Sequence, residues 1–218
     1  MRVFDSDGKF IRVFFALTNF VGLGIIWALL SLTIIGFGPA TTALYYTLVK
    51  AIRKDRGKPY LSFFQSFKTN FLQGMLLGLL VLLLYPAVLF ICAPYLLEPL
   101  VTGSISNGLF FIGALLQTFF VVSTAAYAFP ILSRFNVSCI KSLGFGLKLT
   151  LFHLPSSILI TFLVFICLYL MIAVQYLIWL FPCLFMFVSS FLIEKVLKKN
   201  TPESAYNTDP LFDNWFRD

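Results

Sequence analysis

Charged residues are scarce in this sequence, and their scarcity excludes most soluble folds. Asp, Glu, Lys and Arg make up 11% of the 218 residues, whereas 60% of the residues are hydrophobic. A soluble domain usually carries about 25% charged residues, and a chain with far fewer cannot cover an aqueous surface. The length suits one membrane domain, so we expect a single transmembrane helical domain over residues 1–199 and a cytoplasmic C-terminal tail over residues 200–218.

Side chains that could bind a metal or act in catalysis are also scarce. His153 is the only histidine, and the four cysteines show no Cys-x-x-Cys spacing, so the sequence predicts no metal site and no cofactor. It contains neither a Gly-x-Ser-x-Gly elbow nor a Walker-type glycine loop. Every charged residue lies at or beyond the end of an apolar run, Glu98 and Glu194 included, which leaves no buried carboxylate for a proton relay. We therefore predict that the protein is not an enzyme.

The positive net charge of +7 has a plain explanation in a membrane protein. The basic residues lie between apolar runs, where lysine and arginine set the orientation of the helices and meet anionic lipid. No basic stripe interleaved with aromatic residues occurs on a soluble element. The sequence therefore indicates membrane lipids as partners and excludes nucleic acid.

The first uncharged run, Val13–Val49, is too long for one crossing. As a single helix it would measure roughly 55 Å at about 1.5 Å per residue, against a hydrocarbon core of about 30 Å. We place a turn at Gly36, Gly38 and Pro39, because glycine permits a tight turn and proline suits the first position of a helix.

The apolar runs predict an all-α polytopic transmembrane bundle of six helices. The expected helices are Val13–Ile35, Pro39–Arg53, Phe71–Leu97, Leu109–Phe129, Pro155–Ile178 and Pro182–Leu197, with the second and sixth short. All sixteen basic residues then lie on one side, which the positive-inside rule assigns to the cytoplasm together with both termini. A five-crossing alternative leaves the second helix in the interface and the N-terminus outside. Pro86 and Pro94 are expected kink sites in the third helix.

Two of the predicted cytoplasmic connections are amphipathic. Residues 60–71 place four phenylalanines on one helical face, and residues 141–148 occupy the equivalent place before the fifth span. This spacing is typical of a helix that lies on a membrane surface. Such a face could also dock on a partner protein. The four phenylalanines are Phe63, Phe64, Phe67 and Phe71.

The remaining polar side chains within the apolar runs are neutral. The candidates are Thr42, Tyr45, Tyr46, Gln117, Thr124 and Tyr127. Small and neutral polar residues are the usual material of interhelical packing and hydrogen bonding in membranes. The same residue types could line a cavity for a neutral polar solute. We favour packing and keep the cavity as the alternative.

The stretch Trp27–Tyr46, with its Gly-Pro-Ala-Thr block followed by Tyr-Tyr, resembles the bacterial YesL family of uncharacterised membrane proteins. Other segments that resemble the family are 48–53, 62–71 and 190–197. Two positions depart from the family pattern, because Thr33 stands where proline is common and Gly24 where asparagine is common.

The resemblance implies a multi-pass protein of the bacterial cytoplasmic membrane. Members of the family are typically encoded beside carbohydrate ABC transporters and glycan-degrading enzymes, which implies permease or ATPase subunits as partners. No reaction is established for the family, so no catalytic residue is carried over. We expect an accessory subunit or regulator of a carbohydrate importer. The alternative is a self-contained transporter or channel for a small neutral polar solute, and the sequence leaves homo-oligomer formation open.

Overall fold

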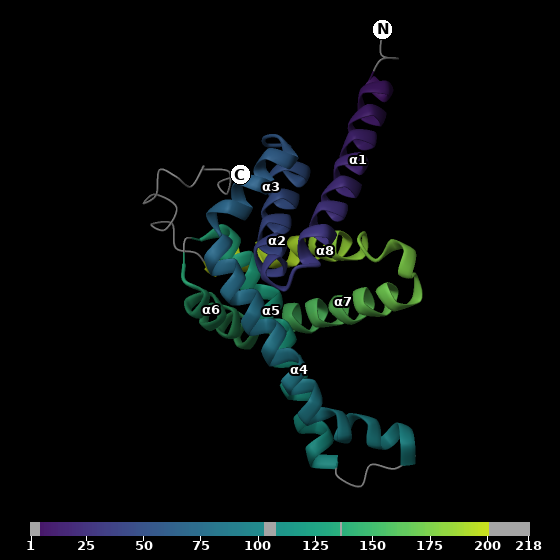
Figure 1. Cartoon of the computed structure of the whole chain (residues 1–218), viewed down its shortest axis with the longest axis vertical. Coiled ribbons are helices and arrows are strands. Elements are labelled where there is room, and N and C mark those ends of the chain that lie inside the picture. The colour runs from purple at the N-terminus through teal and green to yellow at the C-terminus, as the bar shows by residue number, and fades with distance from the viewer. Residues whose placement is uncertain (1–4, 103–107, 136, 201–218) are drawn as a thin grey trace.

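The computed structural model describes residues 5–102, 108–135 and 137–200, which form helices joined by short connections (Figure 1). The α-helices are α1 (Asp5–Ser31), α2 (Ile34–Thr47), α3 (Pro59–Thr69), α4 (Phe71–Thr102), α5 (Gly108–Arg134), α6 (Cys139–Phe152), α7 (Leu154–Ala173) and α8 (Phe181–Asn200). A π-helical turn, η1 (Leu48–Arg53), continues α2, and a 3₁₀ turn, η2 (Gln175–Leu177), follows α7. The predicted all-α class is confirmed. Of the predicted tail over residues 200–218, Asn200 ends α8 and the remainder lies outside the described residues.

The turn between α1 and α2 lies before the position that we predicted. α1 ends at Ser31, and Thr33 caps α2 by accepting the N–H of Gly36 on its hydroxyl at 3.1 Å, as threonine commonly does at an N-cap. Pro39 therefore lies inside α2, and the prediction that it begins the helix was wrong. Gly36 still matters for this turn, because a Cβ there would collide with the carbonyl of Leu30.

Gly38 has a different use, which is the close approach of α2 to α4. A Cβ on Gly38 would collide with the carbonyl of Gly74 and would lie 2.9 Å from the Cα of Gly78. A Cβ on Gly78 would in turn meet the Gly38 Cα at 2.7 Å. Small residues of this kind allow two helix backbones to pack directly on each other. The predicted turn glycines thus include one that serves helix packing.

Three described helices are long and apolar enough to cross a membrane. These segments are Phe71–Tyr95 in α4, Leu109–Arg134 in α5 and Leu154–Ala173 in α7, and Leu17–Ser31 of α1 is a shorter apolar helix. α4 bends in its C-terminal part, which contains the predicted kink sites Pro86 and Pro94 (Figure 1). The number of crossings and their orientation stay predictions.

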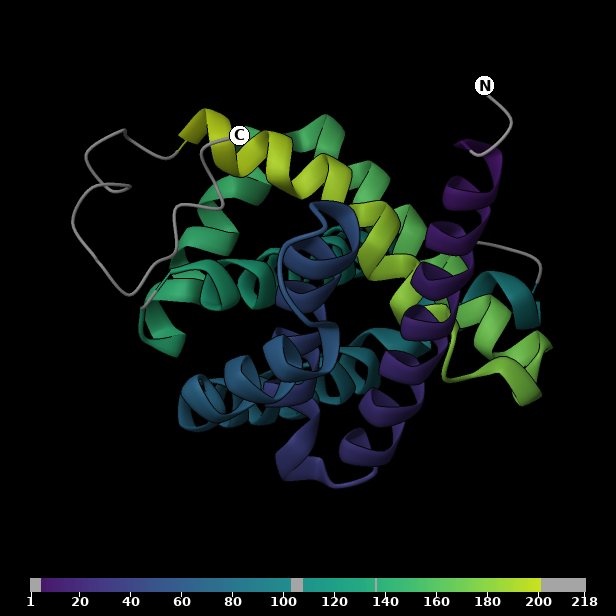
Figure 2. The ribbon, with the colours of Figure 1, turned by 90° about the horizontal axis from the view of Figure 1, so that it is seen from above.

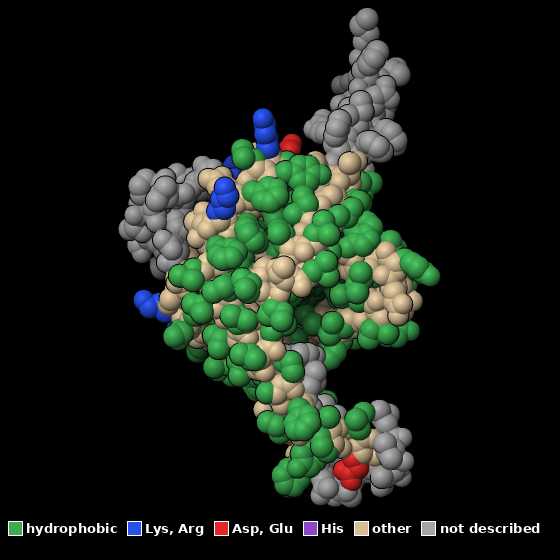
Figure 3. Space-filling model, viewed as in Figure 1, with side chains coloured by type: hydrophobic (Ala, Val, Ile, Leu, Met, Phe, Trp, Pro, Cys, Tyr) green, Lys and Arg blue, Asp and Glu red, His purple; other side chains and the backbone are tan. Residues whose placement is uncertain are grey.

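The helices form two hairpins that run across each other. α4 and α5 extend together to a tip that projects from the body, whereas α7 and α8 run back along each other beside it (Figures 1 and 2). Apolar side chains cover most of the face shown in Figure 3, where Lys and Arg appear only along the upper and left margins. Such a surface suits contact with lipid.

The main core lies where α2, α3, α5 and α8 meet. Leu44, Leu48, Phe63 and Ile193 are almost inaccessible to solvent there and belong to one hydrophobic cluster. α3 and α6, at the positions of the two predicted amphipathic connections, both form as helices. α3 packs on α2, so one of its faces is used inside the protein.

Candidate functional site

A buried ionic cluster joins three helices that are distant in sequence. The Tyr45 hydroxyl on α2 donates to Oε1 of Glu194 on α8 at 3.0 Å. Arg134, in the last turn of α5, donates from Nη1 to Oε2 of the same carboxylate at 2.9 Å. The side chains of Arg134 and Glu194 are only 1% and 6% exposed. A buried charge requires both a partner and hydrogen bonds, and here one carboxylate fastens three helices at a single point.

A second arginine holds α8 one turn earlier. Arg53 ends the π-helical turn and donates from Nη1 to the carbonyl of Ser190 at 3.0 Å. Its guanidinium lies 4.1 Å from the ring centroid of Phe191, a cation–π contact. Ser190 and Glu194 are separated by one helical turn, so both arginines contact the same part of α8. Widened turns such as η1 are frequent at functional sites.

This cluster was not predicted from the sequence. We expected every charged residue to lie at or beyond the end of an apolar run and no carboxylate to be buried, but Arg134 and Glu194 are only 1% and 4% exposed, so the second expectation was wrong. The available signal was that Glu194 directly follows an apolar run and yet lies within the last turn of the sixth predicted helix, Pro182–Leu197. A carboxylate that a helix places next to apolar surroundings needs a partner. Nothing in a single sequence named Arg134 as that partner.

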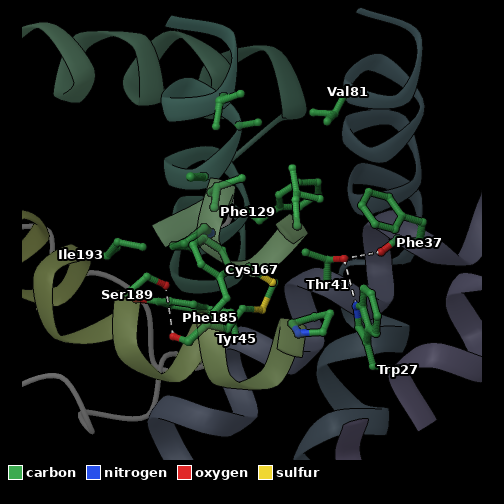
Figure 4. Close-up of a pocket in the computed structure, with 18 of the residues that line it drawn as sticks. Trp27, Phe37, Thr41, Tyr45, Val81, Phe129, Cys167, Phe185, Ser189 and Ile193 are labelled. Carbon is green, nitrogen blue, oxygen red and sulfur yellow. Dashed lines mark hydrogen bonds between the residues drawn. The ribbon is translucent and has the colours of Figure 1, made fainter. Parts of the chain in front are cut away.

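A cavity of about 290 Å³ lies against the cluster. Its wall comes from α1, α2, α4, α5, α7 and α8, and Tyr45 is shared between the cavity and the ionic cluster (Figure 4). The other side chains that Figure 4 labels are mostly apolar, among them Phe37, Phe129 and Phe185. Its chemistry therefore differs from the polar cavity that we considered from the sequence.

The structure separates the neutral polar candidates and engages most of them locally. Thr42 is fully buried and donates to the carbonyl of Gly38 at 3.0 Å. The Tyr46 hydroxyl accepts from Lys50 at 3.0 Å. Tyr127 is fully buried, and its hydroxyl accepts a long hydrogen bond of 3.5 Å from Ser157.

The two remaining candidates, both on α5, lie apart from the cavity wall. Thr124 is half-buried beside α6, where a Cβ on Gly146 would lie 2.8 Å from the Thr124 carbonyl. Gln117 is on the exposed face of the helix. Of the six candidates, Tyr45 alone lines the cavity described above.

The predicted phenylalanine row, which runs along α3 and ends with Phe71 at the start of α4, is divided between the core and the surface. Phe63 is fully buried, and Phe67 is partly buried against the same core cluster. Phe64 and Phe71 are exposed, at 45% and 38%. The rings of Phe63 and Phe67 stack with centroids 6.4 Å apart. Of these four phenylalanines, only Phe64 on α3 and Phe71 at the start of α4 are exposed enough to contribute to a docking surface.

Metal-binding groups do not gather within the described residues, where no three His, Cys, Asp or Glu side chains are placed to hold an ion. His153 forms a 2.7 Å hydrogen bond with the side-chain amide of Asn200. The cysteines, among them Cys92 and Cys183 in the interior, are free thiols.

Long apolar helices, an apolar outer face and a polar cluster sealed inside define this chain as a helical membrane protein. Residues 16–91, from the middle of α1 into α4, match the model of a family described as a protein of unknown function, DUF624. The matched segment includes Tyr45 but neither Arg134 nor Glu194. No curated protein and no solved structure matches the chain.

Proposed function

We propose that this protein is a non-enzymatic membrane subunit that associates with a bacterial carbohydrate ABC import system in the cytoplasmic membrane. The resemblance of Trp27–Tyr46 to the YesL family supports the connection to carbohydrate import. The DUF624 match over residues 16–91 supports membership of a family with no described activity. The observation that carries the proposal is the outer face of α5.

Gly113 and Gln117 lie one turn apart on that face, within the segment of α5 that is long and apolar enough to cross a membrane. Both residues are exposed, and a Cβ added to Gly113 would meet nothing within 4 Å. The side-chain oxygen of Gln117 lies 3.8 Å from the Cys92 sulfur, which is a weak hydrogen bond. An amide exposed to lipid is unfavourable, whereas an amide beside a glycine favours close packing with another transmembrane helix. This face therefore suits a partner's helix.

The alternative, a transporter for a small neutral polar solute, has less support. Its expected lining residues Thr42, Gln117 and Thr124 lie apart from the cavity. The fourth, Tyr45, already donates its hydroxyl to Glu194. A polar solute would therefore meet an apolar wall, which offers little to replace the hydrogen bonds that the solute makes with water.

The test is affinity purification from native membranes in mild detergent, followed by mass spectrometry. We expect an ABC permease subunit in fixed proportion to the wild-type chain. Gln117→Leu should lower this recovery, because it removes the amide from the contact face. Gln65→Leu, the same change at an exposed position of α3, is the control and should leave recovery unchanged. Purification of the wild-type chain alone, as a monomer or homo-oligomer, would contradict the proposal.

A further inference from the structure

The three hydroxyl groups in the wall of the cavity beside the ionic cluster each donate their proton to another group of the protein. Thr41 accepts from the indole N–H of Trp27 at 3.2 Å and donates to the carbonyl of Phe37 at 2.7 Å (Figure 4). Ser189 donates to the carbonyl of Met186 at 3.3 Å, and Tyr45 donates to Glu194. A ligand that needs hydrogen-bond donors would find these protons already engaged, and the rest of the wall is almost entirely apolar, so the cavity favours hydrocarbon.

The position of the cavity indicates where that hydrocarbon comes from. The lining residues on α4, α5 and α7, such as Val81, Val121 and Val164, lie inside the three segments that are able to cross a membrane. The cavity wall is therefore built in part from the segments whose length and composition suit lipid tails. Figure 3 shows a recess in the apolar surface between α4 and the α7–α8 hairpin, on the side where the cavity lies.

The size of the cavity agrees with one flexible chain. Its volume of about 290 Å³ is just below the range of about 300–1,000 Å³ for small-molecule sites. An empty apolar space would forfeit dispersion contacts for every side chain around it. A slender acyl chain restores these contacts without needing a polar partner, whereas a helix of another protein is too wide for the space.

We propose that the cavity binds the acyl chain of a membrane lipid. The chain enters between α4 and the α7–α8 hairpin and contacts Met171, Phe185 and Met186, which line the inner wall. Because Tyr45 belongs to both the cavity and the ionic cluster, the bound chain lies directly against the point at which α2, α5 and α8 are joined. This proposal does not rest on the proposed association with an importer.

The experiment uses the full chain in phosphatidylcholine vesicles that contain a phospholipid with a photoactivatable diazirine on one acyl chain. After illumination, mass spectrometry locates the cross-links. We expect them to concentrate on the cavity residues of α7 and α8. Val164→Trp fills the cavity and should reduce these cross-links several-fold. Val188→Trp, the same change on the exposed face of α8, should leave them unchanged.

Ala125→Leu fills the cavity with a smaller side chain and provides a second test if the tryptophan variant misfolds. Size-exclusion chromatography and circular dichroism establish that each variant keeps its helices. Cross-links spread evenly over exposed residues, and unchanged by Val164→Trp and Ala125→Leu, would overturn the proposal. The partner test is independent, because Gln117→Leu should not alter cross-linking and Val164→Trp should not alter recovery of the permease.

Discussion

Arg134 and Glu194 form a 2.9 Å ion pair although 60 residues separate them in the sequence. The pair joins the end of α5 to the C-terminal half of α8, and Tyr45 adds α2 to the same carboxylate. A buried ion pair and one hydrogen bond therefore link α2, α5 and α8 in the interior of the protein. We expect this cluster to fix how α2, α5 and α8 are aligned, a role that buried ion pairs have in some proteins.

We expect Glu194→Leu to lower the free energy of unfolding by about 3–5 kcal/mol, because it leaves the Arg134 charge buried without its carboxylate. The double variant Arg134→Met/Glu194→Leu should lose much less than the sum of its two single variants. The measurement is the thermal unfolding of four detergent-solubilised proteins: the wild type, the two single variants and the double variant. Size-exclusion chromatography monitors the loss of folded protein. Additive losses would show that the two side chains do not interact.

The contact between α2 and α4 makes Gly38 intolerant of any side chain. We expect Gly38→Ala to destabilise the protein, because its new methyl group would push the backbone of Gly74 away. Gly113→Ala is the control, since its methyl group enters open space and alanine favours a helix over glycine by about 1 kcal/mol. The measurement is the unfolding temperature of each variant in detergent. A stable Gly38→Ala protein would contradict the close packing of the two helices.

The two neighbouring phenylalanines of α3 should respond differently to truncation. Phe63→Ala is expected to cost about 3–5 kcal/mol, because it empties a fully buried site. Phe64→Ala should cost much less, since that ring is 45% exposed. Unfolding temperatures of the two variants provide the comparison. Equal losses would mean that α3 does not pack in the described orientation.

The six-crossing prediction places both chain ends in the cytoplasm. Alkaline phosphatase fused to the N-terminus should therefore be inactive, because that enzyme matures only outside the cytoplasm, whereas a fluorescent-protein fusion at the same end should be bright. The five-crossing alternative predicts the reverse for the N-terminus. Fusions at the C-terminus, which is cytoplasmic in both schemes, are the control.

Much of the fold could be predicted because lipid imposes strict limits on length and charge. The apolar runs located α4, α5 and α7, and proline indicated the start of α8 to within one residue of Phe181. The turn between α1 and α2 was misplaced because Gly36 and Pro39 have two possible uses. Both residues occur in turns and in close packing, and only the position of the neighbouring helix distinguishes these uses.

The sequence by itself determined that this is an all-α chain built for a membrane, because hydrophobic composition and the spacing of charges are properties of the chain alone. Tertiary structure decided which residues meet. From the sequence, Glu194 and Arg134 are charges near helix ends, and only the tertiary structure brings the two side chains together in the interior. The cavity likewise exists only between assembled helices, since its apolar wall comes from six of them and no single helix carries its pattern.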